Sequence, residues 1–186
     1  MGMAHGLETL IAAAEQLQRE LPSSMFLLIG EGAEKEHIAH LAVARGLTNI
    51  CFLDQQPKEN IPAYISGADV CLVMLKKTEL FKTVIPTKLL EYMACERAVI
   101  VAVDGQARKL VEEANAGIFV EPEDIRALVD AIRELSSDPE RRTRLGVSGR
   151  RYIVAQLSRE STARTYLGVL EEVRSRWRQS GEMTAE

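Results

Sequence analysis

The chain has few aromatic residues, few cysteines and no long apolar run. Aromatic residues make up 5% of its 186 residues, and no C-x-x-C pair occurs among the three cysteines. The sequence therefore gives no sign of a zinc ribbon, a thioredoxin-like motif or a disulfide framework. No signal-peptide pattern and no apolar stretch of roughly 20 residues, the length of a membrane span, is present. We expect a cytoplasmic protein whose cysteines are small core residues.

The chain also lacks an excess of positive charge. Its 23 Lys and Arg against 27 Asp and Glu give a net charge of −4, which argues against a nucleic-acid-binding protein. A local basic run extends from Arg141 to Arg151, with Tyr152 as its aromatic neighbour. We expect a solvated helix face there, and an anionic partner is the alternative.

Short apolar runs alternate with amphipathic segments along most of the chain. We expect strands at 25–30, 49–53, 69–75, 98–103 and 117–120. We expect helices at 7–17, 34–45, 59–66, 86–94, 106–115, 123–135, 139–155 and 160–178. Strands without polar alternation, each separated by a helix, predict a parallel sheet covered on both faces. The predicted fold is α/β, a Rossmann-like doubly wound sheet in a single domain 1–186, with helices in 139–178 as a C-terminal extension. Ligands of such sheets bind at the carboxyl ends of the strands.

The segment "VIPTKLLEYMA" carries the first candidate site. Pro86 suits the first position of a helix, and the N–H groups of Thr87 and Lys88 would then point out of the helix N-terminus. Such a terminus binds anions, and Lys88 adds a positive charge. Glu91 shares their helix face and could accept hydrogen bonds from a ribose diol. The segment could bind a nucleoside diphosphate, or Glu91 could merely complement the helix dipole while Lys88 is solvated.

The segment "GEGAEK" half-matches a dinucleotide fingerprint. Gly30 and Gly32 follow an expected strand and open a helix, but Lys35 occupies the position of the third glycine. Asp54 stands where an acid that binds ribose belongs. We favour a tight strand-to-helix turn that lines some other ligand over an NAD site.

The histidines and carboxylates do not form a recognisable active site. His37 and His40 lie three residues apart without a clear third ligand, so we expect a solvated helix face and no metal site. His5 is a further candidate because it precedes a glycine at a helix start. The catalytic residues remain unidentified at this level.

These motifs, in this order, resemble the C-terminal, donor-nucleotide-binding domain of GT-B, GT4-type glycosyltransferases. The stretches are "IPAYISGADV", "LLEYMA" and "VEPED", and "VIPTK" is most similar to bacterial polysaccharide and O-antigen enzymes such as fucosamine-type transferases. The resemblance implies that Glu91 binds the ribose and that the helix N-terminus at Thr87 and Lys88 takes the diphosphate. It also implies a nucleotide-sugar donor, a UDP-sugar by our expectation, a lipid-linked or polysaccharide acceptor, and neither metal nor cofactor.

The chain departs from the family pattern in three ways. Thr83 stands where many relatives have a first acid, and His5 precedes Gly6 where many have lysine. Judged by the resemblance, we expect the N-terminal acceptor domain and the first, central strand of the sheet to be missing from this sequence. We expect a gap between the strands at 25–30 and 69–75, self-association through the incomplete sheet as one way to fill it, and no transferase activity from the chain alone.

Two other functions stay open from the sequence. One is a fragment of a GT-B sugar-nucleotide epimerase, and the other is a non-catalytic nucleotide-sensing or partner-binding module. The last helix bears on the second. It carries an apolar stripe that we expect to pack in a core, with an exposed face as the alternative: Ala163, Tyr166, Leu167, Leu170, Val173 and Trp177. The full-length enzyme could associate peripherally with the inner membrane.

Overall fold

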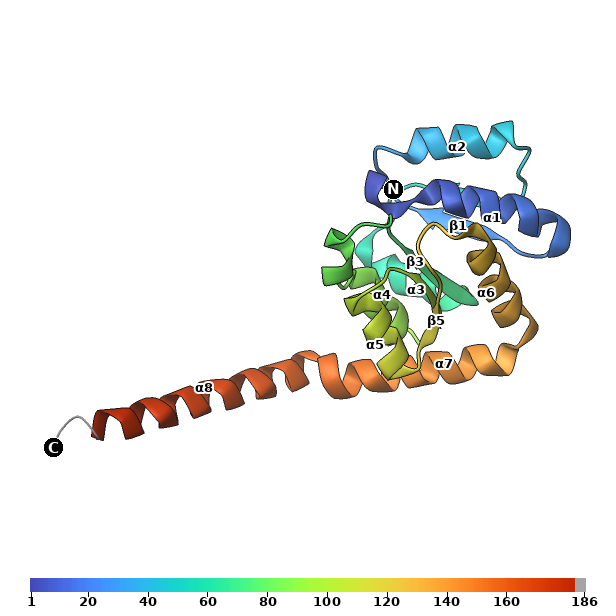
Figure 1. The fold of residues 1–186 in the computed structure, drawn as a ribbon. Coiled ribbons are helices and arrows are strands. Elements are labelled where there is room, and N and C mark those ends of the chain that lie inside the picture. The colour runs from blue at the N-terminus through green and yellow to red at the C-terminus, as the bar shows by residue number, and fades with distance from the viewer. Residues whose placement is uncertain (183–186) are drawn as a thin grey trace. The chain divides into compact units, whose positions relative to one another are not determined.

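The computed structural model describes residues 1–182, with side chains up to Trp177. Helices and parallel strands alternate along most of it, as the sequence predicts (Figure 1). The strands are β1 (Phe26–Ile29), β2 (Ile50–Leu53), β3 (Val70–Met74), β4 (Ala98–Ala102) and β5 (Gly117–Phe119). The helices are α1 (Leu7–Glu20), α2 (Lys35–Ala44), α3 (Ile61–Gly67), α4 (Thr87–Ala94), α5 (Gln106–Ala114), α6 (Ile125–Ser137), α7 (Pro139–Tyr152) and α8 (Arg159–Glu182).

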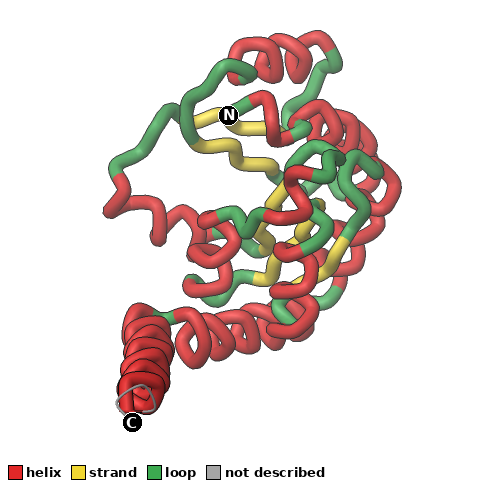
Figure 2. The backbone as a smooth tube through the Cα atoms, turned by 60° about the vertical axis from the view of Figure 1, so that its left-hand side comes forward, coloured by secondary structure: helices red, strands yellow, loops and turns green. Residues whose placement is uncertain are grey.

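The strands form two separate parallel sheets in the described residues. One sheet pairs β1 with β2, and the other has the order β3-β4-β5. Phe26 lies opposite Ile50 in the first sheet, and Val70 lies opposite Ala98 in the second. Figure 2 shows the two sets of strands in yellow. The expected gap between β1 and β3 is therefore confirmed, because each of them has a single hydrogen-bonded neighbour within residues 1–182.

Helix α1 covers one face of the sheets because its apolar residues recur at helical spacing. Leu10, Ala13, Ala14 and Leu17 are buried along one side of the helix. They share a core with α6 and with the side chains of β4 that point the same way. Burial of each large side chain contributes roughly 1.5–3 kcal/mol. Figure 1 shows α1 between α2 and α6, in agreement with its contacts to both.

The opposite face of β4 is covered by α4 and α5. Every residue of β4 is buried, as expected for a strand between two neighbours with helices on both faces. Because side chains alternate along a strand, Val99 and Val101 face away from the α1 and α6 core. Leu89 and Met93 of α4 are fully buried against this side. The N-terminus of α4 is thereby held at the carboxyl end of β3 and β4.

Two sequence-based expectations about helices were wrong. Pro86 is not the first residue of α4: its ψ of 131° is extended, and it caps the helix from outside. The apolar stripe of α8 does not pack in a core, because Tyr166, Leu170 and Trp177 have exposed fractions of 64%, 47% and 79%. Helical spacing predicts a stripe, but it does not reveal whether another element lies against it.

Of the three cysteines, one is buried as the sequence predicts. Cys71 is buried, and burial raises the pKa of its thiol to about 12. Cys51 and Cys95 are partly exposed, so the expectation of burial was wrong for them.

The arginines of the basic run between Arg141 and Arg151 form ion pairs. Arg142 pairs with Asp69 and Arg150 with Glu96. The basic run is thus a helix face with its own counter-ions.

The described chain forms two compact units, one up to Arg150 and one from Arg151 onward. A π-helical turn, Ile153–Leu157, precedes α8 in the second unit. No helix in residues 1–182 combines the length and apolar composition that crossing a bilayer requires.

Candidate functional site

The N-terminus of α4 presents two backbone N–H groups and a cation. The first helical hydrogen bond runs from the Leu89 N–H to the Pro86 carbonyl, over 2.9 Å. The N–H groups of Thr87 and Lys88 precede it and have no acceptor within the helix. The Lys88 ammonium is half-buried and has no carboxylate partner within the described residues, and loss of solvation lowers its pKa. This combination of free donors and an uncompensated cation suits an anion.

His5 lies beside Lys88, at the turn that opens α1. His5 Nδ1 lies 3.1 Å from the Gly2 backbone nitrogen and 3.0 Å from the Gly2 carbonyl oxygen, so each tautomer of the neutral ring has a backbone partner. Burial and the Lys88 charge lower the pKa of His5. Gly6 follows in the left-handed region at φ 61° and caps α1, a conformation that glycine adopts without strain. The structure thus brings His5 and Lys88 together, as the candidate site requires.

The loop after β1 is held by Met1 and by an ion-pair network. Gly32 has a φ of 148°, and a Cβ placed there would lie 2.2 Å from the Met1 carbonyl oxygen. The Lys35 ammonium lies 2.6 Å from both Asp54 and Glu31. Asp54 is therefore already paired with the residue that replaces the third glycine. This pairing disfavours an NAD site, since Asp54 would have to bind the ribose.

Of the remaining predicted residues, Thr87 and Glu91 lie on α4, Thr83 lies in the segment before it, and Gly30 follows β1. Glu91 and Thr87 are exposed, and the Glu91 carboxylate makes no hydrogen bond or ion pair with any residue up to Trp177. The Thr83 hydroxyl donates to the Leu80 carbonyl over 2.8 Å. Gly30 takes a φ of 119° with open space where its Cβ would be. Apart from the peptide bond between Thr87 and Lys88, no hydrogen bond or ion pair joins these residues to His5 or Lys88 in the part of the chain whose side chains are described.

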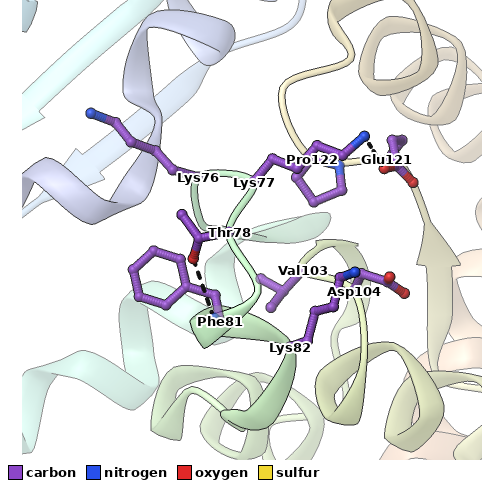
Figure 3. A pocket seen from close by; sticks show the side chains of 9 residues that line it. All are labelled: Lys76, Lys77, Thr78, Phe81, Lys82, Val103, Asp104, Glu121 and Pro122. Carbon is purple, nitrogen blue, oxygen red and sulfur yellow. Dashed lines mark hydrogen bonds and ion pairs between the residues drawn. The ribbon is translucent and has the colours of Figure 1, made fainter.

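A second group of charged residues lines a small cavity at the carboxyl ends of β3, β4 and β5 (Figure 3). Its lining includes Lys76, Lys77, Lys82, Asp104 and Glu121, around a volume of about 40 Å³. Lys77 pairs with Glu121 at 2.7 Å, and this hydrogen-bonded carboxylate raises the pKa of Lys77. This cavity was not predicted from the sequence. The signal was present, because these residues follow three strands whose carboxyl ends meet at one edge.

The histidines of α2 belong to a solvated helix face, as expected. His37 Nε2 lies 3.2 Å from a carboxylate oxygen of Glu8, and both side chains are largely exposed. His40 is exposed as well. Across the described residues, no three His, Cys, Asp or Glu side chains converge as metal ligands would.

A family model described as "Glycosyl transferases group 1" matches residues 3–152. The chain belongs to this family. It is 28% identical to a GDP-mannose-dependent alpha-(1-6)-phosphatidylinositol monomannoside mannosyltransferase of Mycolicibacterium smegmatis, over 79% of this chain and 39% of that protein. It is 27% identical to the alpha-D-kanosaminyltransferase of Streptomyces kanamyceticus, over 90% of this chain and 42% of that protein. The chain thus spans well under half the length of these relatives.

Solved structures confirm the fold. The sucrose-phosphate synthase of Thermosynechococcus elongatus matches with a TM-score of 0.77 and 28% identity, over 92% of this chain and 43% of that one. Anabaena HepE, solved in complex with UDP-glucose, matches with a TM-score of 0.75 and 21% identity, over 94% of this chain and 46% of that one. The chain has the Rossmann-like α/β fold of the C-terminal domain of GT-B glycosyltransferases. The specific similarity to fucosamine-type transferases stays a prediction.

Proposed function

We propose that this chain is the donor-binding half of a glycosyltransferase and binds the diphosphate of a nucleotide sugar at the N-terminus of α4. The observation that carries this proposal is the half-buried Lys88 ammonium, which has no carboxylate partner in the described residues. Removing a cation from water without a counter-ion is unfavourable. A bound diphosphate would supply the missing negative charge, and membership of the group 1 family supports a nucleotide-sugar ligand.

Each candidate residue has a distinct role in this proposal. The N–H groups of Thr87 and Lys88 donate to the phosphates, and the Lys88 ammonium neutralises them. His5 donates from Nε2 at the same anion, and a bound diphosphate would favour its protonated form. Glu91 accepts hydrogen bonds from the ribose hydroxyls, which is consistent with a carboxylate that has no protein partner in the described chain. Gly30, Gly32 and Thr83 line the approach of the donor.

The charged rim of the cavity in Figure 3 is our candidate contact for the hydroxyl groups at the sugar end of the donor. Asp104 and Glu121 can accept hydrogen bonds from sugar hydroxyls, and Lys76 and Lys82 can donate to them. During transfer, the bond between the anomeric carbon and the diphosphate oxygen breaks, and negative charge grows on the diphosphate. The N-terminus of α4 and Lys88 would stabilise that charge. The acceptor, lipid-linked or polysaccharide in our proposal, would contact a part of the enzyme beyond this chain.

The identity of the nucleotide base is still to be determined, and UDP and GDP are the two candidates. The family resemblance favours a UDP-sugar, whereas the Mycolicibacterium relative is named as GDP-mannose-dependent. Calorimetric titration of the chain with UDP, GDP, ADP and NAD would decide between them. We expect one diphosphate nucleotide to bind and NAD not to bind.

A pair of variants tests the site itself. Glu91→Ala should weaken binding of that nucleotide by roughly tenfold or more, the cost of one or two hydrogen bonds to a charged group. Glu36→Ala removes an exposed carboxylate of α2 and should bind as the parent chain does. Equal binding by both variants would refute the role of Glu91, and the absence of binding by any nucleotide would refute the proposed function.

A further inference from the structure

Helix α8 presents an apolar face that no residue of the described chain covers. Every residue of α8 from Thr162 to Trp177 is exposed. Six large apolar side chains lie among them, with exposed fractions between 47% and 79%: Tyr166, Leu167, Val169, Leu170, Val173 and Trp177. A contiguous apolar surface of this kind marks an interaction site. A single helix in water is also only marginally stable unless another element packs on its apolar face.

The apolar residues of α8 follow a seven-residue repeat. Ala163, Leu170 and Trp177 are seven residues apart, and they form one apolar position of the repeat. Tyr166 and Val173 form the second apolar position, three residues further along in each repeat. This spacing is that of helices that pack side by side with interlocking side chains. The face of α8 therefore suits another helix.

The charges of α8 argue against a lipid surface as the partner. Helices that lie in a membrane surface carry mainly Lys and Arg on their polar face. Between residues 159 and 177, by contrast, four arginines stand beside three glutamates. Glu160 pairs with Arg164, and Glu172 pairs with Arg176, one turn apart within the helix. A nearly balanced polar face of this kind suits a partner helix that also carries both signs of charge.

The apolar face is complementary to a second copy of itself in the antiparallel direction. When two antiparallel copies of α8 are aligned at Gly168, Ala163 lies opposite Val173 of the second copy. Tyr166 then lies opposite Leu170 of the second copy. Each pair occurs twice by symmetry. Every apolar position of the repeat between Ala163 and Val173 thus meets an apolar residue.

The same alignment also matches the charges that border this face. Glu160 lies opposite Arg174 of the second copy, on the flank of the apolar core. Trp177 lies opposite Arg159 of the second copy, and a guanidinium over an indole ring is a favourable contact. In a parallel pair, by contrast, Arg174 would lie beside Val169 of the second copy, and Glu160 would have no arginine opposite it. The charges therefore favour the antiparallel pair.

We propose that α8 joins two copies of this chain as an antiparallel helix pair centred on Gly168. Both copies contribute the same residues to the interface, because a two-fold axis relates them. The paired segment is about five turns long between Arg159 and Trp177. Such a short interface should form reversibly, so the mass of the particle in solution should rise with protein concentration.

Sedimentation equilibrium of the whole chain tests this proposal. Over about a hundredfold range of concentration, we expect the parent chain to pass from monomer to dimer. Leu170→Asp places a charge in the centre of the apolar face and should keep the chain monomeric over that range. Ser175→Asp adds the same charge on the opposite face of α8, at an exposed position, and should dimerise as the parent does. Circular dichroism of both variants checks that α8 remains helical.

Reversal of the bordering charges tests the direction of the pair. Glu160→Arg and Arg174→Glu each place like charges opposite each other twice, so each should weaken dimerisation by roughly fivefold or more at low salt. The double variant restores opposite charges and should dimerise nearly as the parent does. It carries the cost of both substitutions within its own helix, so the recovery must come from contact between the copies. Glu171→Arg makes the same change of charge on the outer side and should have an effect of about twofold or less.

Four results would overturn the proposal. The parent chain could remain monomeric at every concentration. The Leu170→Asp variant could dimerise as the parent does, which would assign the contact to another surface, such as the edges of the two sheets. The double variant could dimerise as weakly as the single ones, which would exclude the antiparallel alignment. A monomeric chain could bind vesicles of phosphatidylserine and phosphatidylcholine and lose that binding in Leu170→Asp, which would assign the face to lipid. No nucleotide is present in these measurements, so their outcome is independent of the donor-site proposal.

Discussion

The Ala4 carbonyl accepts a 2.8 Å hydrogen bond from the Lys76 backbone N–H. This bond joins the turn before α1 to the loop after β3, two segments that are far apart in the sequence. It brings the residue before His5 next to Lys76, which lines the charged cavity. Substitution of a glycine beside this cavity tests how closely its loops approach each other.

Gly105→Ala should destabilise the chain by about 2 kcal/mol or more. Gly105 has a φ of 80°, and a Cβ there would lie 2.1 Å from the Lys82 carbonyl oxygen, so the substitution combines strain with a backbone clash. Gly67→Ala is the matched control: it ends α3 and has open space around the site of its Cβ, so it should be neutral or slightly stabilising. Urea denaturation of both variants measures the difference. Equal stability would contradict the close approach of the two loops.

Lys88→Met should weaken nucleotide binding without lowering the stability of the fold. The half-buried ammonium loses solvation without gaining a partner in the described chain, so its removal should leave the free energy of unfolding unchanged or raise it by up to about 1 kcal/mol. Binding of the nucleoside diphosphate should fall by roughly tenfold or more. Lys109→Met, at an exposed position of α5, should change neither. A marked loss of stability in Lys88→Met would assign the lysine a structural role.

His5 should make the chain less stable as the pH falls below neutrality. Burial and the Lys88 charge hold its pKa in the folded state below the ordinary value of 6.5. As the pH drops through that ordinary value, the unfolded chain takes up a proton that the folded chain still excludes, so the free energy of unfolding decreases. The decrease ends once the folded form is protonated too. Denaturation curves of the parent chain and His5→Gln, compared from about pH 8 to about pH 5, should diverge, and parallel curves would contradict this assignment.

Truncation after Tyr152 should leave the melting of the first compact unit unchanged. Helix α7 is part of that packing: Leu145 is buried, Ser148 donates to the Ala114 carbonyl over 2.7 Å, and Arg142 donates to the Leu135 carbonyl over 2.6 Å. Truncation after Asp138 removes these contacts and should lower the melting temperature by several degrees or more. Calorimetry of both shortened chains makes the comparison. A large loss on removal of α8 alone would contradict it.

The sequence predicted the alternation of helices and strands because each apolar run has a period that matches one element. Leu10, Ala14 and Leu17 recur at helical spacing and are buried, and the continuous run in β4 is buried on both faces. The gap beside β1 was expected from the resemblance to the glycosyltransferase family, whose sheet has a further strand at that place. The helices and strands thus follow from local pattern, whereas the gap required the family resemblance.

The features that could not be predicted depend on contacts between distant segments. Nothing in the segment Tyr166 to Trp177 reveals whether another element lies against its apolar stripe. Proline is compatible with both the first helical position and the capping position, and only the ψ angle of Pro86 shows that it occupies the capping position. The pairing of Lys35 with Asp54 likewise requires knowledge of how the loops after β1 and β2 meet.

The contact between α1 and α6 has a consequence for synthesis of the chain on the ribosome. The buried face of α1, which includes Leu10 and Leu17, packs against Leu128 and Ile132 of α6. More than a hundred residues separate these partners, and at about 5–20 residues per second α1 waits several seconds or longer for α6 to emerge. During that interval its apolar face is available to chaperones. Slow codons between the two helices should therefore raise the fraction of newly made chains that aggregate.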